Sequence, residues 1–236
     1  MPHVQTDPIT HVVASQMCTG CGACAGLFPN LIRMVDDTQN GRRPVVDSSP
    51  EGAVAAQSAM SVCAGAGADH ASLPVRDSID QDWGPVLKVW EGWAADDEIR
   101  FRGSSGGAAT ALSLFMLEAG EANGVCHIAQ RQDDPRLNKS VISVNREELL
   151  RGSGSRYAQA SPGERLNDIK QTNGTVAFIG KPCDISSVAK ATATAPLLRS
   201  KIKATIAIFC AGAPTLAATD ALLDRLAVPQ DSTLTD

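Results

Sequence analysis

Three cysteines stand close together near the start of the chain, in the run CTGCGAC over residues 18–24. Cysteines at C-x2-C-x2-C spacing can bind three corners of one iron–sulfur cube. The glycines between them let the backbone turn sharply and bring its amides toward the sulfides, which stabilises an anionic cluster. The spacing therefore predicts that Cys18, Cys21 and Cys24 are three of the four ligands of a 4Fe-4S cluster.

The fourth ligand must come from elsewhere in the chain. In two-cluster ferredoxins the run continues x3-C-P, and that cysteine binds the other cluster. Here the position is Phe28, followed by Pro29, so we expect a single cube in this region. Cys63 is the only other cysteine before Cys126, which makes it the candidate fourth ligand. Zinc also accepts four thiolates, but its sites usually show two separated C-x2-C pairs. Zinc and chemically inert thiols remain the alternatives.

Two further cysteines each stand at the end of a predicted strand. Cys183 and Cys210 lie where open α/β sheets place their ligands, at the carboxyl ends of the strands. On spacing alone, both are better explained as small buried side chains. Cys126 falls inside a predicted strand and is expected in the core.

Two loops rich in glycine, serine and arginine precede helices or turns, at 102–110 (RGSSGGAAT) and 151–157 (RGSGSRY). A glycine-rich loop at a helix N-terminus can receive phosphate on free backbone amides. The first loop lacks the signatures of a P-loop or a dinucleotide fingerprint, so a tight turn without ligand stays open. Two such loops in one domain favour a nucleotide-like cofactor. No histidine lies in a nucleophile motif, so a hydrolase is not expected.

Composition excludes several classes of function. The chain has 236 residues, a net charge of −5 and only 4% aromatic residues, which disfavours nucleic-acid binding. The most apolar stretch, 108–117, is about half the length of a membrane-spanning helix. The N-terminus lacks a signal peptide, and seven cysteines in such a chain argue against a disulfide framework. We therefore expect a cytoplasmic protein with no membrane span.

Beyond the first 80 residues, strand and helix patterns alternate, which predicts an α/β domain with a mostly parallel sheet. We divide the chain into a small ferredoxin-like, cysteine-rich module at 1–80 and an α/β domain at 81–236, with a boundary over 77–85. The predicted strands are 45–46, 86–90, 125–129, 141–144, 175–179 and 205–210. The predicted helices are 50–62, 105–119, 146–150, 161–171 with a Ser161–Glu164 capping box, one from about 184, and 214–226.

These segments together resemble the coenzyme F420 hydrogenase/dehydrogenase beta-subunit family. The family's cysteine run stands at 18–24, its Ser-Gly-Gly-x-x-Thr-Ala-Leu segment at 105–112, and its Gly-Ser/Thr-Lys/Arg-Tyr segment at 154–157. Its Gly-x-Pro-Cys segment stands at 180–183, and its strand ending in Phe/Tyr-Cys ends here at Cys210. The segments follow in the family's order across nearly the whole chain.

The resemblance implies an iron–sulfur flavoprotein oxidoreductase. It passes electrons between a small hydride donor or acceptor, with coenzyme F420 as a candidate substrate, FAD, an iron–sulfur cluster and a redox partner protein or subunit. The residues expected to bind FAD are Ser105, Gly106, Gly107, Thr110, Gly154, Ser155, Arg156, Tyr157 and Lys181. By the same resemblance, Cys183 and Cys210 become ligands of a second cluster.

One departure from the family concerns that second cluster. Members that hold it supply a further Cys-x-x-Cys pair downstream, and this sequence has none up to Asp236. We therefore expect the flavin-binding domain to be incomplete. A non-catalytic electron-transfer or docking module is the main alternative to an enzyme.

Overall fold

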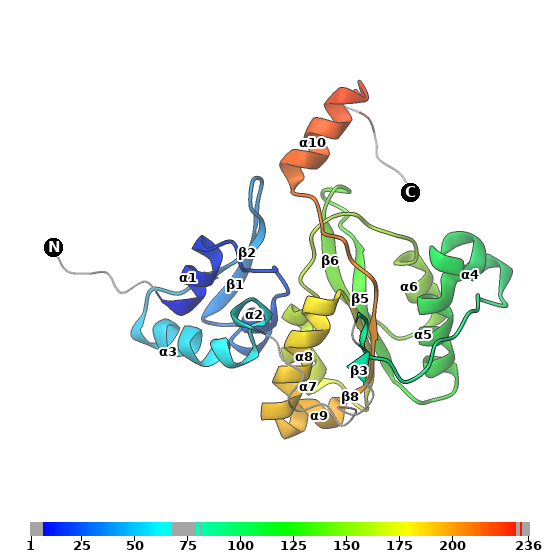
Figure 1. Ribbon diagram of the computed structural model, residues 1–236, viewed down its shortest axis with the longest axis horizontal. Coiled ribbons are helices and arrows are strands. Elements are labelled where there is room, and N and C mark those ends of the chain that lie inside the picture. The colour runs from blue at the N-terminus through cyan, green and yellow to red at the C-terminus, as the bar shows by residue number, and fades with distance from the viewer. Residues whose placement is uncertain (1–6, 68–78, 81, 230–231, 233–236) are drawn as a thin grey trace.

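A four-stranded mixed sheet forms the centre of the larger part of the molecule (Figure 1). It belongs to a computed structural model that describes residues 7–67, 79–80, 82–229 and 232. The strand order is β6-β5-β7-β8, with β5, β7 and β8 parallel and β6 antiparallel to β5. The strands are β5 (Gly124–Gln130), β6 (Asn138–Ser143), β7 (Val176–Gly180) and β8 (Ile202–Ala207). The predicted α/β class with a mostly parallel sheet is confirmed.

Helices cover both faces of this sheet (Figure 1). One face carries α4 (Asp97–Arg102), the 3-10 turn η4 (Ser105–Gly107), α5 (Ala108–Glu118) and α6 (Arg146–Arg151). The other carries η5 (Pro162–Arg165), α7 (Leu166–Gln171), α8 (Pro182–Thr194) and α9 (Pro196–Lys201). Because side chains alternate along a strand, Ala177 packs with the first group while its neighbours Val176 and Phe178 pack with the second. A central strand buried on both faces explains the continuous apolar run of β7.

The first 67 residues form a smaller unit of helices and a hairpin. Its elements are α1 (Pro8–Ala14), α2 (Ala23–Leu27), β1 (Ile32–Asp37), β2 (Gly41–Val46), α3 (Pro50–Ala59), η1 (Met60–Val62) and η2 (Ala64–Ala66). β1 and β2 pair antiparallel, from Ile32 opposite Val46 to Asp37 opposite Gly41. The unit has its own apolar cluster, which includes Ile9, Ile32, Ala55 and Ala59.

The two parts also share a core. Ala23 of α2 and Val62 of η1 are buried in the same cluster as Phe178 of β7 and Val188 of α8. The 3-10 turn η5 lies against the cysteine run, where the Gly163 N–H donates to the Cys21 carbonyl at 2.9 Å. The division at residue 80 stays a prediction, and part of the proposed boundary at 77–85 falls on residues outside the described part.

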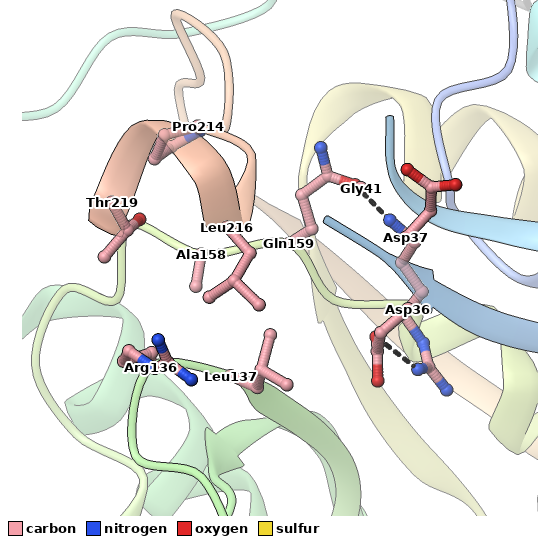
Figure 2. A pocket seen from close by; sticks show the side chains of 11 residues that line it. Asp36, Asp37, Gly41, Arg136, Leu137, Ala158, Gln159, Pro214, Leu216 and Thr219 are labelled. Atoms are coloured by element: carbon pink, nitrogen blue, oxygen red, sulfur yellow. Dashed lines mark hydrogen bonds and ion pairs between the residues drawn. The ribbon is translucent and has the colours of Figure 1, made fainter. Parts of the chain in front are cut away.

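A further contact between the two parts involves α10 (Leu216–Arg225), near the end of the chain. Figure 2 shows a pocket in which Leu216 and Ala158 face the tip of the β1–β2 hairpin. The Ala217 N–H donates to the Thr38 carbonyl at 3.0 Å, and Arg136 pairs with Asp220 at 2.6 Å. The hairpin tip thus contacts α10, which Arg136 in turn joins to the segment before β6.

Several sequence predictions of local structure are wrong. Residues 86–90 form no strand, and only the two-residue β3 (Ile79–Asp80) and β4 (Gly84–Pro85) pair nearby. Leu87, Val89 and Trp90 are exposed, so their alternating pattern serves no buried sheet face. The last strand ends at Ala207, which leaves Cys210 in the following loop. The hairpin strand β1 was not predicted.

The Ser161–Glu164 capping box does not form. The Ser161 hydroxyl instead donates to the Gly20 carbonyl at 2.6 Å, in the middle of the cysteine run. Glu164 pairs with Arg42 of β2 at 2.8 Å. Both side chains bind groups of the N-terminal unit and therefore do not cap a helix. A 3-10 turn precedes α7 at this point.

Candidate functional site

Four cysteines, three from the run at 18–24 and one from further along the chain, line one pocket in the N-terminal unit. The pocket brings together the predicted set of Cys18, Cys21, Cys24 and Cys63. The rest of its wall is mostly apolar and includes Ile9, Val12, Met34 and Pro44. Four sulfur donors around an apolar space form a donor set suited to a soft metal or to iron–sulfur chemistry.

Two glycines make the turn around this pocket possible. Gly20 and Gly22 have φ values of +70° and +80°, in the left-handed region that side chains rarely adopt. Both also lie too close to neighbours for a side chain: a Cβ on Gly20 would lie 2.7 Å from the Arg42 carbonyl oxygen. Backbone N–H groups of Gly20, Ala23 and Ala25 reach Cys18, Cys21 and Cys24, respectively. The amides are thus directed at the sulfurs.

Burial raises the pKa of three thiols in this set, Cys18, Cys21 and Cys24. For Cys24 the neighbouring Cys21 and Cys18 raise the pKa further, because like charges would repel. Backbone N–H groups oppose this only in part. Four thiolates in such a pocket require positive charge between them, which a metal or iron–sulfur centre supplies. The residues present therefore fit such a group.

A single metal ion and a cube differ in the spacing of the thiolates that each requires. Among the described residues, no three His, Cys, Asp or Glu side chains are placed to hold one metal ion. One zinc ion binds thiolates at about 2.3 Å, which brings its sulfurs to within about 4 Å of each other. In a cube each thiolate binds a different iron, so the sulfurs stand further apart.

Helix α8 of the larger part forms one side of the cysteine site. The Ser187 hydroxyl lies 3.3 Å from the Cys21 sulfur and accepts the Ala64 N–H at 3.2 Å. Lys190 donates to the Cys63 carbonyl at 2.9 Å and also to the Gly67 carbonyl. Sequence reasoning did not identify either residue, although both follow Cys183 at helical spacing, four and seven positions on.

The other two candidate metal ligands differ in their surroundings. Gly180 of β7 and Ala207 of β8 are paired in the parallel part of the sheet. Cys183 lies three residues after Gly180, and Cys210 lies three residues after Ala207. Burial raises the pKa of Cys183, and Thr19 and Cys21 are among the groups that act on it. Cys183 therefore faces the cysteine run. Cys210 is exposed and accepts the Gly212 N–H at 3.4 Å. Cys126 is fully buried in the core, as predicted.

The two loops predicted to bind a nucleotide-like cofactor lie side by side. The Ser155 hydroxyl donates to the Ser104 hydroxyl at 2.7 Å, directly before η4. Ser105, Gly106 and Gly107 all have positive φ, which turns the backbone sharply into α5, and Thr110 lies in that helix. Gly106 also packs against Trp93, where a Cβ would lie 2.8 Å from the tryptophan Cβ.

The predicted cationic residues of this site bind protein groups in the structure. Arg156 donates to the Asn138 amide oxygen at 2.6 Å and to the Pro135 carbonyl at 2.8 Å. Lys181 pairs with Asp184 at 2.8 Å. Tyr157, two residues beyond Ser155, is 76% exposed. The loops at 105–107 and 154–155 are thus together, while Arg156 and Lys181 hold neighbouring segments.

Asp184 is a buried acid that the sequence did not single out. It is 1% exposed, and burial raises the pKa of its carboxyl despite the ion pair with Lys181. Its Oδ2 accepts the Lys181 N–H at 2.8 Å, which fixes the start of α8. The position follows Cys183 directly, so Asp184 anchors the turn that presents this cysteine to the cysteine run.

Comparisons with known proteins agree on one family. Profiles of the N-terminal and C-terminal parts of the coenzyme F420 hydrogenase/dehydrogenase beta subunit match residues 89–166 and 173–234. The coenzyme F420 hydrogenase subunit beta of Methanosarcina barkeri is 30% identical over 122 residues, which are 50% of this chain and 42% of that protein. The match includes less than half of that relative's length.

A solved structure gives a similar result. The xenon-derivatised F420-reducing NiFe hydrogenase complex from Methanosarcina barkeri matches with a TM-score of 0.52 and 26% identity. The match covers 56% of this chain and 47% of the chain in that complex. Within the described residues, no helix is both long and apolar enough to cross a membrane.

Proposed function

Because this chain belongs to the coenzyme F420 hydrogenase/dehydrogenase beta-subunit family, we propose that it is an iron–sulfur flavoprotein oxidoreductase. It would pass electrons between a small hydride donor or acceptor, FAD and a 4Fe-4S cluster. The observation that carries this proposal is the pocket lined by Cys18, Cys21, Cys24 and Cys63.

The two cofactors divide the chemistry: a flavin takes two electrons as hydride and releases them singly, whereas a cube carries one. The chain's own part is to hold and insulate them. Cys18, Cys21, Cys24 and Cys63 would supply the thiolates, and the apolar wall would keep water from the cluster. Gly20 and Gly22 allow the backbone to wrap around it.

For FAD, the proposed site is the pair of loops joined by Ser104 and Ser155. Free amides at the start of α5, after Ser105, Gly106 and Gly107, would receive phosphate oxygens. Thr110, Gly154, Arg156, Tyr157 and Lys181 complete the proposed set. Arg156 and Lys181 would act by holding the loop and the start of α8, given their present partners.

From the family we also propose a second cluster, a substrate and a partner. Cys183 and Cys210 stay proposed ligands of a second cluster, and coenzyme F420 stays the proposed substrate. A redox partner subunit is supported by the solved relative, which is part of a hydrogenase complex. All seven cysteines are free, which fits a reducing compartment such as the cytoplasm.

Two other functions are tested by the same preparation. A non-catalytic electron-transfer or docking module would hold the cluster without flavin, and a structural protein would hold zinc. The experiment is anaerobic purification and reconstitution, followed by assay of iron, sulfide, zinc and FAD and by the visible spectrum. We expect iron and sulfide in equal amounts, bound FAD, and bleaching by a soluble reductant. A colourless protein without iron after reconstitution would refute the proposal.

One substitution tests the ligand set directly. Cys21→Ser should remove most of the cluster iron and lower the melting temperature, since cluster binding and folding of the N-terminal unit are coupled. Cys126→Ala is the matched control, because Cys126 is a core cysteine of β5 outside the pocket and is not a proposed cluster ligand. It should leave the iron of the first cluster in place. Equal iron content in Cys21→Ser and the unsubstituted protein would contradict the assignment.

A further inference from the structure

Helix α8 presents three side chains to the cysteine site from one face. Cys183, Ser187 and Lys190 stand at helical spacing, so they project in the same direction. Ser187 lies against the cysteine run, with its hydroxyl oxygen 3.3 Å from the Cys21 sulfur. No part of Ser187 is exposed to solvent. The contact is therefore sheltered from water.

The direction of the hydrogen bond follows from the partners of Ser187. A backbone N–H can only donate, so the serine oxygen is the acceptor of the Ala64 N–H at 3.2 Å. A cysteine that binds a cluster is a thiolate, which has no hydrogen to donate, and the Cys21 sulfur lies within reach of the serine hydroxyl. With Cys21 as a thiolate, the hydrogen of Ser187 would therefore point at the sulfur.

We propose that Ser187 donates a hydrogen bond to the Cys21 thiolate and thereby raises the reduction potential of the cluster. This inference rests on the proposed function. Reduction adds one electron, and thus one negative charge, to a cluster and its four thiolates, while no bond forms or breaks. A donor at a ligand sulfur stabilises the more negative, reduced state, and hydrogen bonds to sulfur are among the features that set such potentials.

Ser187 is a positioning residue in this proposal, and its loss should leave the site assembled. Lys190, one turn further along α8, independently holds the loop that carries Cys63 through the Cys63 and Gly67 carbonyls. The thiols of Cys18, Cys21 and Cys24 are carried by the run at 18–24, whose turns depend on Gly20 and Gly22. The ligand framework therefore does not depend on Ser187 alone.

The test is a potentiometric titration of the reconstituted full chain with dithionite, followed by electron paramagnetic resonance of the reduced cluster. Ser187→Ala should shift the midpoint potential to a more negative value while iron and sulfide contents stay unchanged. Ser186→Ala is the matched control, because Ser186 is the preceding, half-buried residue of the same helix. The midpoint potential of the cluster in this variant should equal that in the unsubstituted protein. An unchanged midpoint in a fully loaded Ser187→Ala variant would overturn the inference.

Ser187→Thr keeps both the donor and the acceptor, so it should restore the original potential. If Ser187→Ala binds too little iron and sulfide for a titration, Ser187→Thr decides the test. A threonine variant that restores neither the cluster content nor the midpoint potential would contradict the proposed role of Ser187. The two proposals fail in different ways. If the unsubstituted chain takes up no iron and sulfide, the proposed function itself is wrong. If it binds the cluster and no Ser187 variant shifts the potential, only the role of Ser187 is wrong.

Discussion

Individual side chains in this protein are tuned mainly by burial. The three thiols of the cysteine run and the Asp184 carboxyl all have a raised pKa because a charged form would lose its hydration. Each of these groups is therefore easier to keep neutral until a compensating charge arrives. For the thiols, that charge is the proposed cluster, and the N–H groups directed at the sulfurs prepare the site for it.

Burial also disfavours the charged form of His127, which for an imidazole is the protonated form. Burial lowers the pKa of its imidazole, which lies 2.8 Å from the Ser143 hydroxyl. Below the unfolded pKa of about 6.5, the unfolded chain binds a proton that the folded chain resists. The free energy of unfolding should therefore decrease as the pH falls below that value, by at most about 1.4 kcal/mol per pH unit from this group.

The measurement is urea unfolding of the unsubstituted chain and His127→Gln between pH 7.5 and pH 5. His127→Gln should flatten the pH dependence, because glutamine keeps polar atoms but does not titrate. His11→Gln, at an exposed position on α1, serves as the control and should leave the dependence as it is. Identical slopes for His127→Gln and the unsubstituted protein would show that another group causes the acid sensitivity.

At the level of elements, the cysteine run depends on a close approach of two backbones. A Cβ on Gly163 would lie 2.7 Å from both the Ala23 nitrogen and the Cys21 carbonyl oxygen. On the facing helix, a Cβ on Gly26 would lie 2.0 Å from the Gly163 carbonyl oxygen. Any side chain at either glycine would push α2 away from η5.

Gly163→Ala should therefore destabilise the protein, by about 1–3 kcal/mol as for an overpacked core position. The expected result is a lower urea midpoint together with slower or incomplete cluster loading. Gly92→Ala is the matched control, because a Cβ at Gly92 has nothing within 4 Å. Equal urea midpoints for Gly163→Ala and Gly92→Ala would show that α2 and η5 can move apart without loss of stability.

The sequence predicts the elements whose patterns are decided locally. The buried runs of β5 and β7 and the apolar stretch of α5 can be found from the sequence, although Leu112 and Phe115 of that helix are exposed. Asn145 caps α6 as predicted, with its side chain accepting the Glu148 N–H. The spacing of Cys18, Cys21 and Cys24 likewise indicates the pocket that they line, and Cys63 follows as the next cysteine in the chain.

The elements that were missed depend on partners far away in the sequence. Ser161 and Glu164 have the pattern of a capping box, but contacts with Gly20 and Arg42 determine their actual roles. The apolar pattern at 86–90 predicts a strand, yet these side chains are exposed and no strand pairs with them. Ser187 is an ordinary helix residue in the sequence, and only the packing of α8 on the N-terminal unit places it beside Cys21.

For the molecule as a whole, the main question is whether the cysteine-bearing unit is a separate domain. It has its own cluster around Ile9 and Ile32, which favours separate folding. It also contributes Ala23 and Val62 to the core that contains Phe178, and Arg42 joins it to Glu164. A buried core common to both parts should couple their unfolding, because neither part can open without exposing apolar surface of the other.

This coupling predicts that a substitution that destabilises one part also destabilises the other. Ile9 is 3% exposed and packs only within the N-terminal cluster, so Ile9→Ala should cost about 2–5 kcal/mol there. If the chain unfolds as one unit, hydrogen exchange at the β7 amides should speed up by the same free energy as exchange in α3. Leu114→Ala, in the core on the α5 face of the sheet, should have the reciprocal effect on α3. Unchanged protection of β7 in Ile9→Ala would instead establish two independently folding parts. In that case, the contacts of α8 with the cysteine pocket would be a docking interface, and the potential of the cluster would respond to its opening.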